Sequence, residues 1–324
     1  MSHNPKFLGI EIGGTKLQLL VADLAGCTEQ HLRYTIDSAK GAENIKIQIA
    51  GGLKQLDDYN NIAAIGVGFG GPVDWKTGNI RVSHQVSGWE DFNLSEWLQD
   101  LTQKPVVTDN DANVAALAEA VYGCGKGFEG VFYITIGSGI GGGMIVQGNI
   151  YHGRTPGEAE VGHLRMNKNG DTLESTCSGW AVNKKIRTYI QKNPGSFLAK
   201  RASANLAPEA TLLRPALEEN DAAAKKIIEE IADDLSFALS HAVHLFHPDI
   251  IVIGGGLSLL EEYLRKPVAK RLSDYVMKAF LPIPPVHIAA LRENAVPVGA
   301  AELAKKYWLS IEKTNSSKYL KTDL

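Results

Sequence analysis

Residues 7–26 read FLGIEIGGTKLQLLVADLAG: an apolar run, then Gly13-Gly14-Thr15, then a second apolar run. Apolar runs on either side of a glycine turn predict two strands joined by a hairpin. Glycine also leaves the backbone uncovered, so that amide N–H groups can reach phosphate oxygens, with the Thr15 hydroxyl as a further donor and Lys16 nearby. From these residues alone, the turn can be a plain hairpin turn or a phosphate loop.

A similar arrangement recurs in residues 131–150, VFYITIGSGIGGGMIVQGNI, where Gly137, Ser138 and Gly139 form the turn. A third glycine run, 254–256, follows the apolar stretch DIIVI and would let a flat ligand such as adenine lie against the main chain. Neither turn matches the P-loop pattern or the dinucleotide fingerprint. One such turn is usually structural, but three in one chain favour a nucleotide site, and the repeat suggests two related halves.

The composition limits the number of domains and the kinds of partner to be expected. The chain has 324 residues, 44% of them hydrophobic, which is enough for one large domain or, as we expect, two. Its formal net charge of −3 predicts no general attraction to nucleic acid or to anionic membranes. The sequence has neither a membrane-length apolar run nor a signal-peptide core, and its three scattered cysteines are typical of reduced thiols. We therefore expect a cytoplasmic protein with no nucleic-acid or membrane partner.

Strand-like and helix-like patterns alternate along the chain. Strands are predicted at 7–12, 17–22, 62–69, 131–136, 143–146 and 250–253. Helices are predicted at 93–101, 111–122 and 221–246, the second capped by Asp109 or Asn110 and the third ended by Pro248. This alternation predicts an α/β architecture with mixed sheets.

Polar residues gather in three further segments. Residues 106–123, VVTDNDANVAALAEAVYG, place Asn110 and Asp111 where a strand meets a helix; Asp111 could accept a proton from a substrate hydroxyl while Asn110 holds that substrate, or the cluster could simply cap the helix. Residues 157–163, GEAEVGH, and 173–180, LESTCSGW, could bind a pair of sugar hydroxyls or form a salt-bridged surface turn. The glycine-rich loop 66–80, GVGFGGPVDWKTGNI, could approach a sugar or form a β-turn.

Three histidines at every third position of the long helix could be metal ligands, but a packed or solvated helix face is the better interpretation because no cysteine or acid cluster accompanies them. They are His241, His244 and His247.

Taken in order, the segments IGGTK, GVGFGGPVD, TDNDANVAALAE, ITIGSGIGGGMIVQGNIYHG, GEAEVGH and DIIVIGGG resemble the ROK family (repressors, open reading frames and sugar kinases) of the actin/hexokinase/Hsp70 superfamily. The resemblance runs over residues 8–304. It implies a two-domain actin-like ATPase (ribonuclease H-like) fold, with mixed sheets flanked by helices, that closes over ATP and a hexose. The domains expected from it are 1–112 plus about 298–324, and 113–297.

The resemblance also implies roles for individual residues. Asp111 resembles the general base that activates the sugar hydroxyl. Positions that hold sugar hydroxyls, or bring the main chain to the sugar, are matched by Asn110, Glu160, His163, Glu174, Gly70 and Gly71. The two phosphate loops and the adenosine run are matched by Gly13, Gly14, Thr15 and Lys16, by Gly137, Ser138 and Gly139, and by Gly254, Gly255 and Gly256. The implied cofactors are ATP and Mg²⁺.

The chain departs from the family pattern at three points. Glu11 stands where the family usually has aspartate, and would serve Mg²⁺ through water with a slightly longer reach. The usual C-x-C-G-x-x-G-C loop is replaced by LRMNKNGDTLESTCSGW at 164–180, so with Cys177 as the one nearby thiol we expect no structural zinc site. Six residues precede Phe7, too few for the winged helix of the repressor branch, which favours a kinase.

The sequence therefore predicts an ATP-dependent hexose kinase similar to glucokinase, acting as a homodimer or homotetramer. Glucose is the default substrate; N-acetylhexosamines, fructose and allose are alternatives, and polyphosphate is an alternative donor. A non-catalytic sugar-sensing protein of the same fold is the competing hypothesis.

Overall fold

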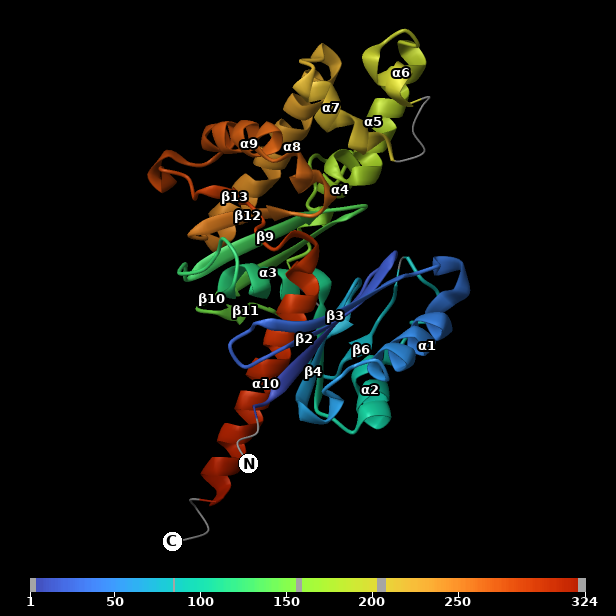
Figure 1. Cartoon of the computed structure of the whole chain (residues 1–324). Coiled ribbons are helices and arrows are strands. Elements are labelled where there is room, and N and C mark those ends of the chain that lie inside the picture. The colour runs from blue at the N-terminus through green and yellow to red at the C-terminus, as the bar shows by residue number, and fades with distance from the viewer. Residues whose placement is uncertain (1–3, 84, 156–158, 203–207, 320–324) are drawn as a thin grey trace. The chain divides into compact units, whose positions relative to one another are not determined.

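The computed structural model describes residues 4–83, 85–155, 159–202 and 208–319 and divides into two compact units (Figure 1). The first unit comprises Met1–Val121, Asn149–Glu158 and Glu293–Leu324; the second comprises Tyr122–Gly148 and Ala159–Arg292. The boundary predicted after residue 112 falls inside a helix that the structure keeps whole in the first unit, and residues 149–158 also join that unit.

The first unit is built on a five-stranded sheet in the order β3-β2-β1-β4-β8. Its strands are β1 (Lys6–Ile12), β2 (Lys16–Ala22), β3 (Thr28–Thr35), β4 (Ile62–Phe69) and β8 (Val106–Asn110). Strands β1 and β2 are antiparallel, which confirms the first predicted hairpin, whereas β1, β4 and β8 run parallel. A small sheet of β5 (Val73–Asp74), β6 (Asn79–Ile80) and β7 (Phe92–Asn93) follows β4.

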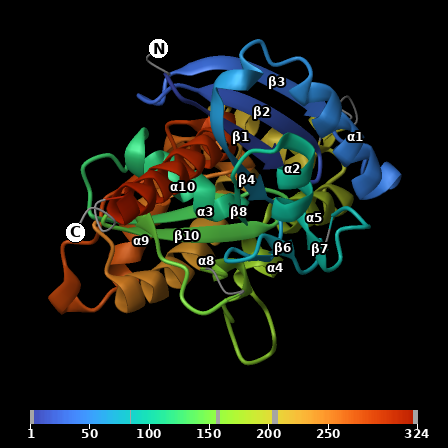
Figure 2. The same cartoon turned by 90° about the horizontal axis from the view of Figure 1, so that it is seen from below.

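Helices cover both faces of this sheet (Figure 2). Alternate side chains of β1 point to opposite faces, so Leu8 and Ile10 pack with α1 and α2 while Phe7 packs with the C-terminal helix. The helical elements of the unit are η1 (Ser38–Lys40), α1 (Gly41–Leu53), η2 (Tyr59–Asn61), α2 (Leu94–Thr102), α3 (Asp111–Val121) and α10 (Ala295–Tyr319). The short strand β11 (Asn149–Ile150) also belongs to it, and η7 (Arg292–Asn294) leads into α10.

Helix α10 lies against the sheet at very short range. A Cβ at Gly9 would be 2.0 Å from the Pro297 carbonyl oxygen, and one at Gly66 would be 1.9 Å from that of Ala300. Only glycine permits this approach, which sets the helix close to β1 and β4, the strands that end at the first glycine turn and at the sugar-loop candidate.

The second unit has strands in the order β10-β9-β12-β13. They are β9 (Gly130–Ile136), β10 (Ile140–Val146), β12 (Ile250–Gly254) and β13 (Val286–Ile288). Strands β9 and β10 are antiparallel, which confirms the second predicted hairpin, and β10 starts three residues earlier than the predicted 143.

The second unit also contains helices and short 3₁₀ turns, several of which pack against alternate side chains of β9 and β12. They are η3 (Val161–His163), α4 (Leu173–Cys177), α5 (Gly179–Lys192), α6 (Phe197–Ala202), η4 (Glu209–Leu212), α7 (Leu213–Glu218), α8 (Ala222–Phe246), η5 (Gly256–Leu260), α9 (Glu262–Tyr275) and η6 (Lys278–Phe280). The longest of them, α8, confirms the predicted helix: Asp221 caps its start by accepting from Ala224 N, and His247 ends it with φ 44°.

The histidines of α8 make aromatic and main-chain contacts. His241 packs edge-on against Phe237, His244 Nε2 accepts from Met277 N at 3.1 Å, and His247 stacks on Phe280.

Candidate active site

The first glycine turn connects β1 to β2. The Gly13 amide donates to the Lys16 carbonyl at 3.0 Å and closes the hairpin. A Cβ at Gly14 would lie 1.5 Å from Gln85 Oε1, so the side chain of Gln85, which the sequence did not single out, lies against the turn. Within the described residues, the amides of Gly14 and Thr15 donate to no main-chain acceptor, which leaves them suited to an anion.

Glu11 is a buried, paired carboxylate beside this turn. It is 4% exposed and lies opposite Gln18 in the β1–β2 register. Its Oε1 is 3.2 Å from Lys16 Nζ, and its Oε2 accepts from Gln18 Nε2. Burial raises the pKa of Glu11, while Lys16 and Gln18 act to lower it.

The second glycine turn connects β9 to β10 and is held by Glu174. Gly137 N donates to Gly139 O at 2.9 Å, and Ile140 N donates to Glu174 Oε2 at 2.8 Å. A Cβ at Gly139 would be 2.5 Å from the same carboxylate oxygen. The structure therefore places Glu174, which the resemblance assigns to the sugar, directly against the second phosphate-loop candidate.

The third glycine run follows β12 and borders a pocket of about 450 Å³ in the second unit. A Cβ at Gly255, where φ is +79°, would be 2.5 Å from the Ile136 backbone, whereas Gly256 faces open space. The pocket is lined largely by apolar groups, including Ile136, Gly137, Ser138, Trp180, Gly256, Leu257, Leu259 and Leu260. Residues of the second turn and the third glycine run thus line one apolar pocket, whose size and lining fit a purine base.

Trp180 of this pocket was not predicted from the sequence. It lies at the start of α5, lines the pocket and remains 60% exposed, so its ring is accessible to a bound ligand.

Asn110 and Asp111 lie where β8 meets α3. Asn110 Oδ1 accepts from Ala112 N at 2.8 Å, so it caps the helix, and its amide nitrogen donates to Gly71 O at 3.2 Å. Asp111 Oδ1 also accepts from Ala112 N at 2.8 Å. A Cβ at Gly70 would be 3.4 Å from Asp111 Oδ2, so the carboxylate lies over the Gly70–Gly71 turn. Asn110 therefore caps α3, and the carboxylate of Asp111 lies beside the glycine-rich loop 66–80 that could approach a sugar.

The preceding residue, Asp109, is 2% exposed and accepts three hydrogen bonds. Its Oδ2 accepts from His152 Nε2 at 2.6 Å, and the ring of His152 stacks on that of Trp75 with centroids 4.1 Å apart. Neither His152 nor Trp75 was predicted to matter.

His163 ends the short turn η3 of the second unit, and Glu160 directly precedes it. Both side chains are exposed, and His163 N donates to Glu160 O at 3.0 Å. A Cβ at Gly162 would be 2.2 Å from Ile140 O, which fixes this turn against β10. Glu158 of the same motif lies outside the described residues.

Within the described residues, no three His, Cys, Asp or Glu side chains form a group that could hold a metal ion. Cys177 is buried in the core of the second unit, where burial raises the pKa of its thiol to about 12, so it is a poor ligand. Glu11 does not fit a preformed Mg²⁺ site, because both its oxygens already have partners. Its contact with Mg²⁺ and the absence of structural zinc stay predictions.

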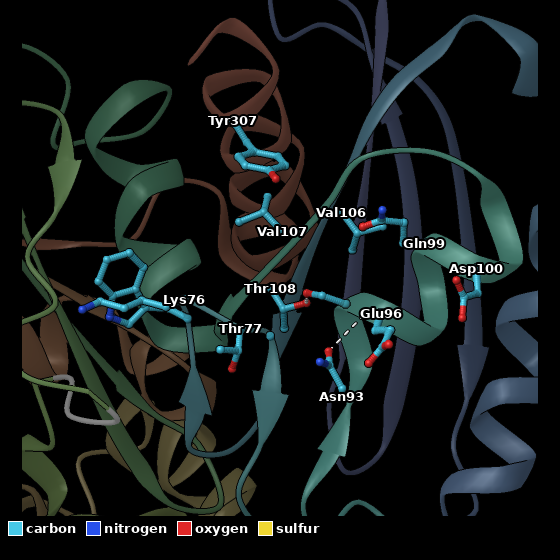
Figure 3. A pocket seen from close by; sticks show the side chains of 13 residues that line it. Lys76, Thr77, Asn93, Glu96, Gln99, Asp100, Val106, Val107, Thr108 and Tyr307 are labelled. Carbon is cyan, nitrogen blue, oxygen red and sulfur yellow. Dashed lines mark hydrogen bonds between the residues drawn. The ribbon is translucent and has the colours of Figure 1, made fainter. Parts of the chain in front are cut away.

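A second pocket, of about 400 Å³, lies in the first unit (Figure 3). It is lined by Trp75, Lys76, Thr77, Asn93, Glu96, Thr108, Tyr307 and their neighbours. Thr108 Oγ1 and Ser95 Oγ share a hydrogen bond of 2.8 Å there, and Asn93 caps α2 by accepting from Glu96 N. None of the predicted site residues lines it.

Comparison with known proteins gives a consistent result. The model of the ROK family matches residues 7–307. A glucokinase of Thermotoga maritima is 30% identical over 310 residues, which cover 93% of this chain and 98% of the relative. A ROK family glucokinase from Streptomyces griseus, solved with glucose and AMPPNP, is 27% identical with a TM-score of 0.82 and covers 93% of this chain and 99% of its own.

A ROK hexokinase from Thermus thermophilus is 27% identical with a TM-score of 0.75, over 95% of this chain and 99% of its own. The predicted actin-like ATPase fold with mixed sheets is therefore confirmed. Among the described residues, no helix is both long and apolar enough to span a bilayer.

Proposed function

The chain belongs to the ROK family, and we propose that Asp111 is the general base with which it transfers the γ-phosphoryl group of ATP to a hydroxyl of a hexose. It is an ATP-dependent sugar kinase. The observation that carries the proposed role is the position of the Asp111 carboxylate, at the start of α3 and over the Gly70–Gly71 turn.

The transfer proceeds by an in-line displacement. Asp111 accepts the proton of the attacking sugar hydroxyl, whose oxygen bonds to the γ-phosphorus as the bond from that phosphorus to the β–γ bridging oxygen breaks, releasing ADP. Asn110 holds the sugar beside the base, and its hydrogen bond to Gly71 O supports this assignment because it ties the base-bearing turn to the sugar loop. Hexose contacts are further proposed for Gly70, Gly71, Glu160, His163 and Glu174.

The nucleotide is proposed to bind through the glycine turns. The base enters the apolar pocket that includes Trp180 and Gly256, and the turns at Gly13–Thr15 and Gly137–Gly139 offer main-chain amides to the phosphates. Mg²⁺ would arrive on the phosphates of ATP and neutralise their charge, as it usually does in kinases. Glu11 holds Lys16 at the first turn, and its own contact with the metal would run through water.

We propose glucose as the substrate, in view of the glucokinases to which the chain is similar, and a cytoplasmic homodimer or homotetramer as its working form, as the family resemblance implies.

A kinase assay on a panel of sugars tests the function. The purified protein with Mg²⁺ and ATP should form ADP in the presence of glucose, and parallel reactions with N-acetylmannosamine, N-acetylglucosamine, fructose, allose and polyphosphate define the substrate and the donor. Tight sugar binding in a calorimeter without any turnover would instead support a sugar-sensing protein.

Asp111→Asn tests the base. This variant should lose about 10²–10⁴-fold in kcat, because a general base contributes that much, and should still bind glucose in a calorimeter. A variant that keeps the wild-type kcat would refute the role of Asp111 without touching the family assignment.

A further inference from the structure

Asp109 is a buried carboxylate with a complete set of donors. Its Oδ1 accepts from Asn110 N at 2.8 Å and from Asn113 Nδ2 at 3.0 Å, and its Oδ2 accepts from His152 Nε2 at 2.6 Å. An ionised carboxylate only accepts hydrogen bonds, so His152 must carry a proton on Nε2. Since a buried charge is costly without partners, removing His152 would leave half of this carboxylate unsatisfied.

His152 is in turn held by Trp75. The two rings are stacked, with an interplanar angle of 14°, and Trp75 lies directly after β5 in the loop that contains Gly70 and Gly71. Trp75 also lines the pocket of Figure 3, and Lys76 Nζ lies 5.4 Å from its ring centroid. The contacts Trp75–His152–Asp109 therefore connect the sugar loop, the end of β8 and the segment after β11.

Asp109 and Asn110 are the last two residues of β8, and the chain turns there into α3, which starts at Asp111. That turn is fixed on one side by the bond from Asn110 to Gly71 O and on the other by the bond from His152 to Asp109. We propose that His152 is a positioning residue, which through Asp109 fixes the turn that presents Asn110 and Asp111 to the sugar. The inference rests on the proposed function of those two residues.

Positioning of this kind has a large effect on rate. A displacement of about 1 Å in a reacting group can cost about 10²-fold, because the aligned geometry supplies much of the acceleration. Replacing His152 can therefore lower the rate by displacing Asp111, without any contact between His152 and the substrate.

The test compares His152→Gln with His152→Asn. The Gln amide can place an N–H group where Nε2 stood and so reach Asp109, whereas the shorter Asn amide cannot. His152→Asn should lower kcat by up to about 10²-fold and weaken glucose binding while leaving KM for ATP within about twofold, and His152→Gln should recover most of both losses. His287→Ala, at an exposed histidine of β13, is the matched control and should behave as wild type.

A double-mutant cycle tests whether the effect of His152 on kcat and on glucose affinity runs through Asp109. If His152 acts through Asp109, then His152→Asn combined with Asp109→Asn should cost no more than the worse single change. Additive costs, or equal kcat and glucose affinity in the Gln and Asn variants, would overturn the proposal. Glucose affinity in a calorimeter keeps the test separate from the proposed function, because it reports on Asn110 even in a protein without turnover.

Discussion

At the scale of single residues, Glu11 is a carboxylate in a place where a charge is costly. It is nearly fully buried on β1, where Lys16 pairs with its Oε1 and the Gln18 amide donates to its Oε2. Burial raises the pKa of Glu11 above its ordinary value of 4.5. A carboxyl whose pKa is raised on folding stabilises the fold most fully below its unfolded pKa, and this contribution is lost as pH rises through the folded pKa.

Glu11→Gln should therefore stabilise the protein increasingly as pH rises. The neutral amide imitates the protonated acid, so Tm of the variant minus Tm of wild type should be smallest below pH 4.5 and should grow toward neutral pH. We expect growth by a few degrees, since about 1 kcal/mol moves Tm by roughly 2–4 °C in a domain of this size. Thermal melts followed by circular dichroism measure it.

Glu129→Gln, at an exposed carboxyl before β9, is the control for this series, and its Tm difference from wild type is subtracted at each pH. If the Tm difference for Glu11→Gln instead decreases as the pH rises from 4.5 to 7, the ion pair with Lys16 outweighs the cost of burial.

The motifs of the sequence singled out individual residues such as Asn110, whose functional roles stay predictions. The sequence left two interpretations of Asn110, a helix cap and a sugar ligand. In the structure its side-chain oxygen caps α3, while its side-chain nitrogen donates to the Gly71 carbonyl oxygen. His152, Trp75 and Gln85 were missed because their partners are far away in the sequence, and no local pattern predicts a ring stack or a side chain laid on a glycine.

At the scale of elements, the glycines have two different structural roles. Those at the turns expose main-chain amides, whereas Gly9 and Gly66 in the middle of strands admit α10 to the sheet. The periodicity of apolar residues predicted both hairpins and the long helix α8. It did not predict β3, because this edge strand has the sequence TEQHLRYT and is largely exposed or half-buried.

Gly66→Ala should destabilise the protein strongly. Its new methyl group would overlap the Ala300 carbonyl oxygen, and overpacking of this kind typically costs about 1–3 kcal/mol, or more where backbone must move. Gly51→Ala is the matched control: this glycine is exposed in α1, has open space around it, and should gain roughly 0.5–1 kcal/mol from the better helix propensity of alanine. Urea unfolding of both variants measures the difference, and equal stabilities would contradict the close packing of α10.

At the scale of the whole molecule, the order of the motifs predicted the family and the fold. The boundaries of the two units could not be predicted from the sequence. The chain returns to the first unit twice, at residues 149–158 and again from residue 293. Such returns depend on contacts between distant segments, of which the pairing of His152 with Asp109 is one.

Truncation should show that the C-terminal segment completes the first unit. A chain ending at Arg292 would leave Phe7, Leu20 and Ala64 without the cover of Ala301, Ala304 and Trp308, so we expect it to be insoluble or to lose cooperative melting. A chain ending at Glu312 keeps that cover and should melt like the full chain. A soluble, cooperatively melting 1–292 fragment would refute this expectation.

The close packing of α10 on Gly9 and Gly66 also has a consequence for biosynthesis. A ribosome delivers β1 and β4 long before it delivers the helix that covers them, whereas every residue of the second unit has been translated by residue 292. The nascent second unit can thus fold first, although its first strand comes later. The sheet of the first unit, which contains the first strand to be made, can therefore be covered completely only after residues 295–319 have been translated.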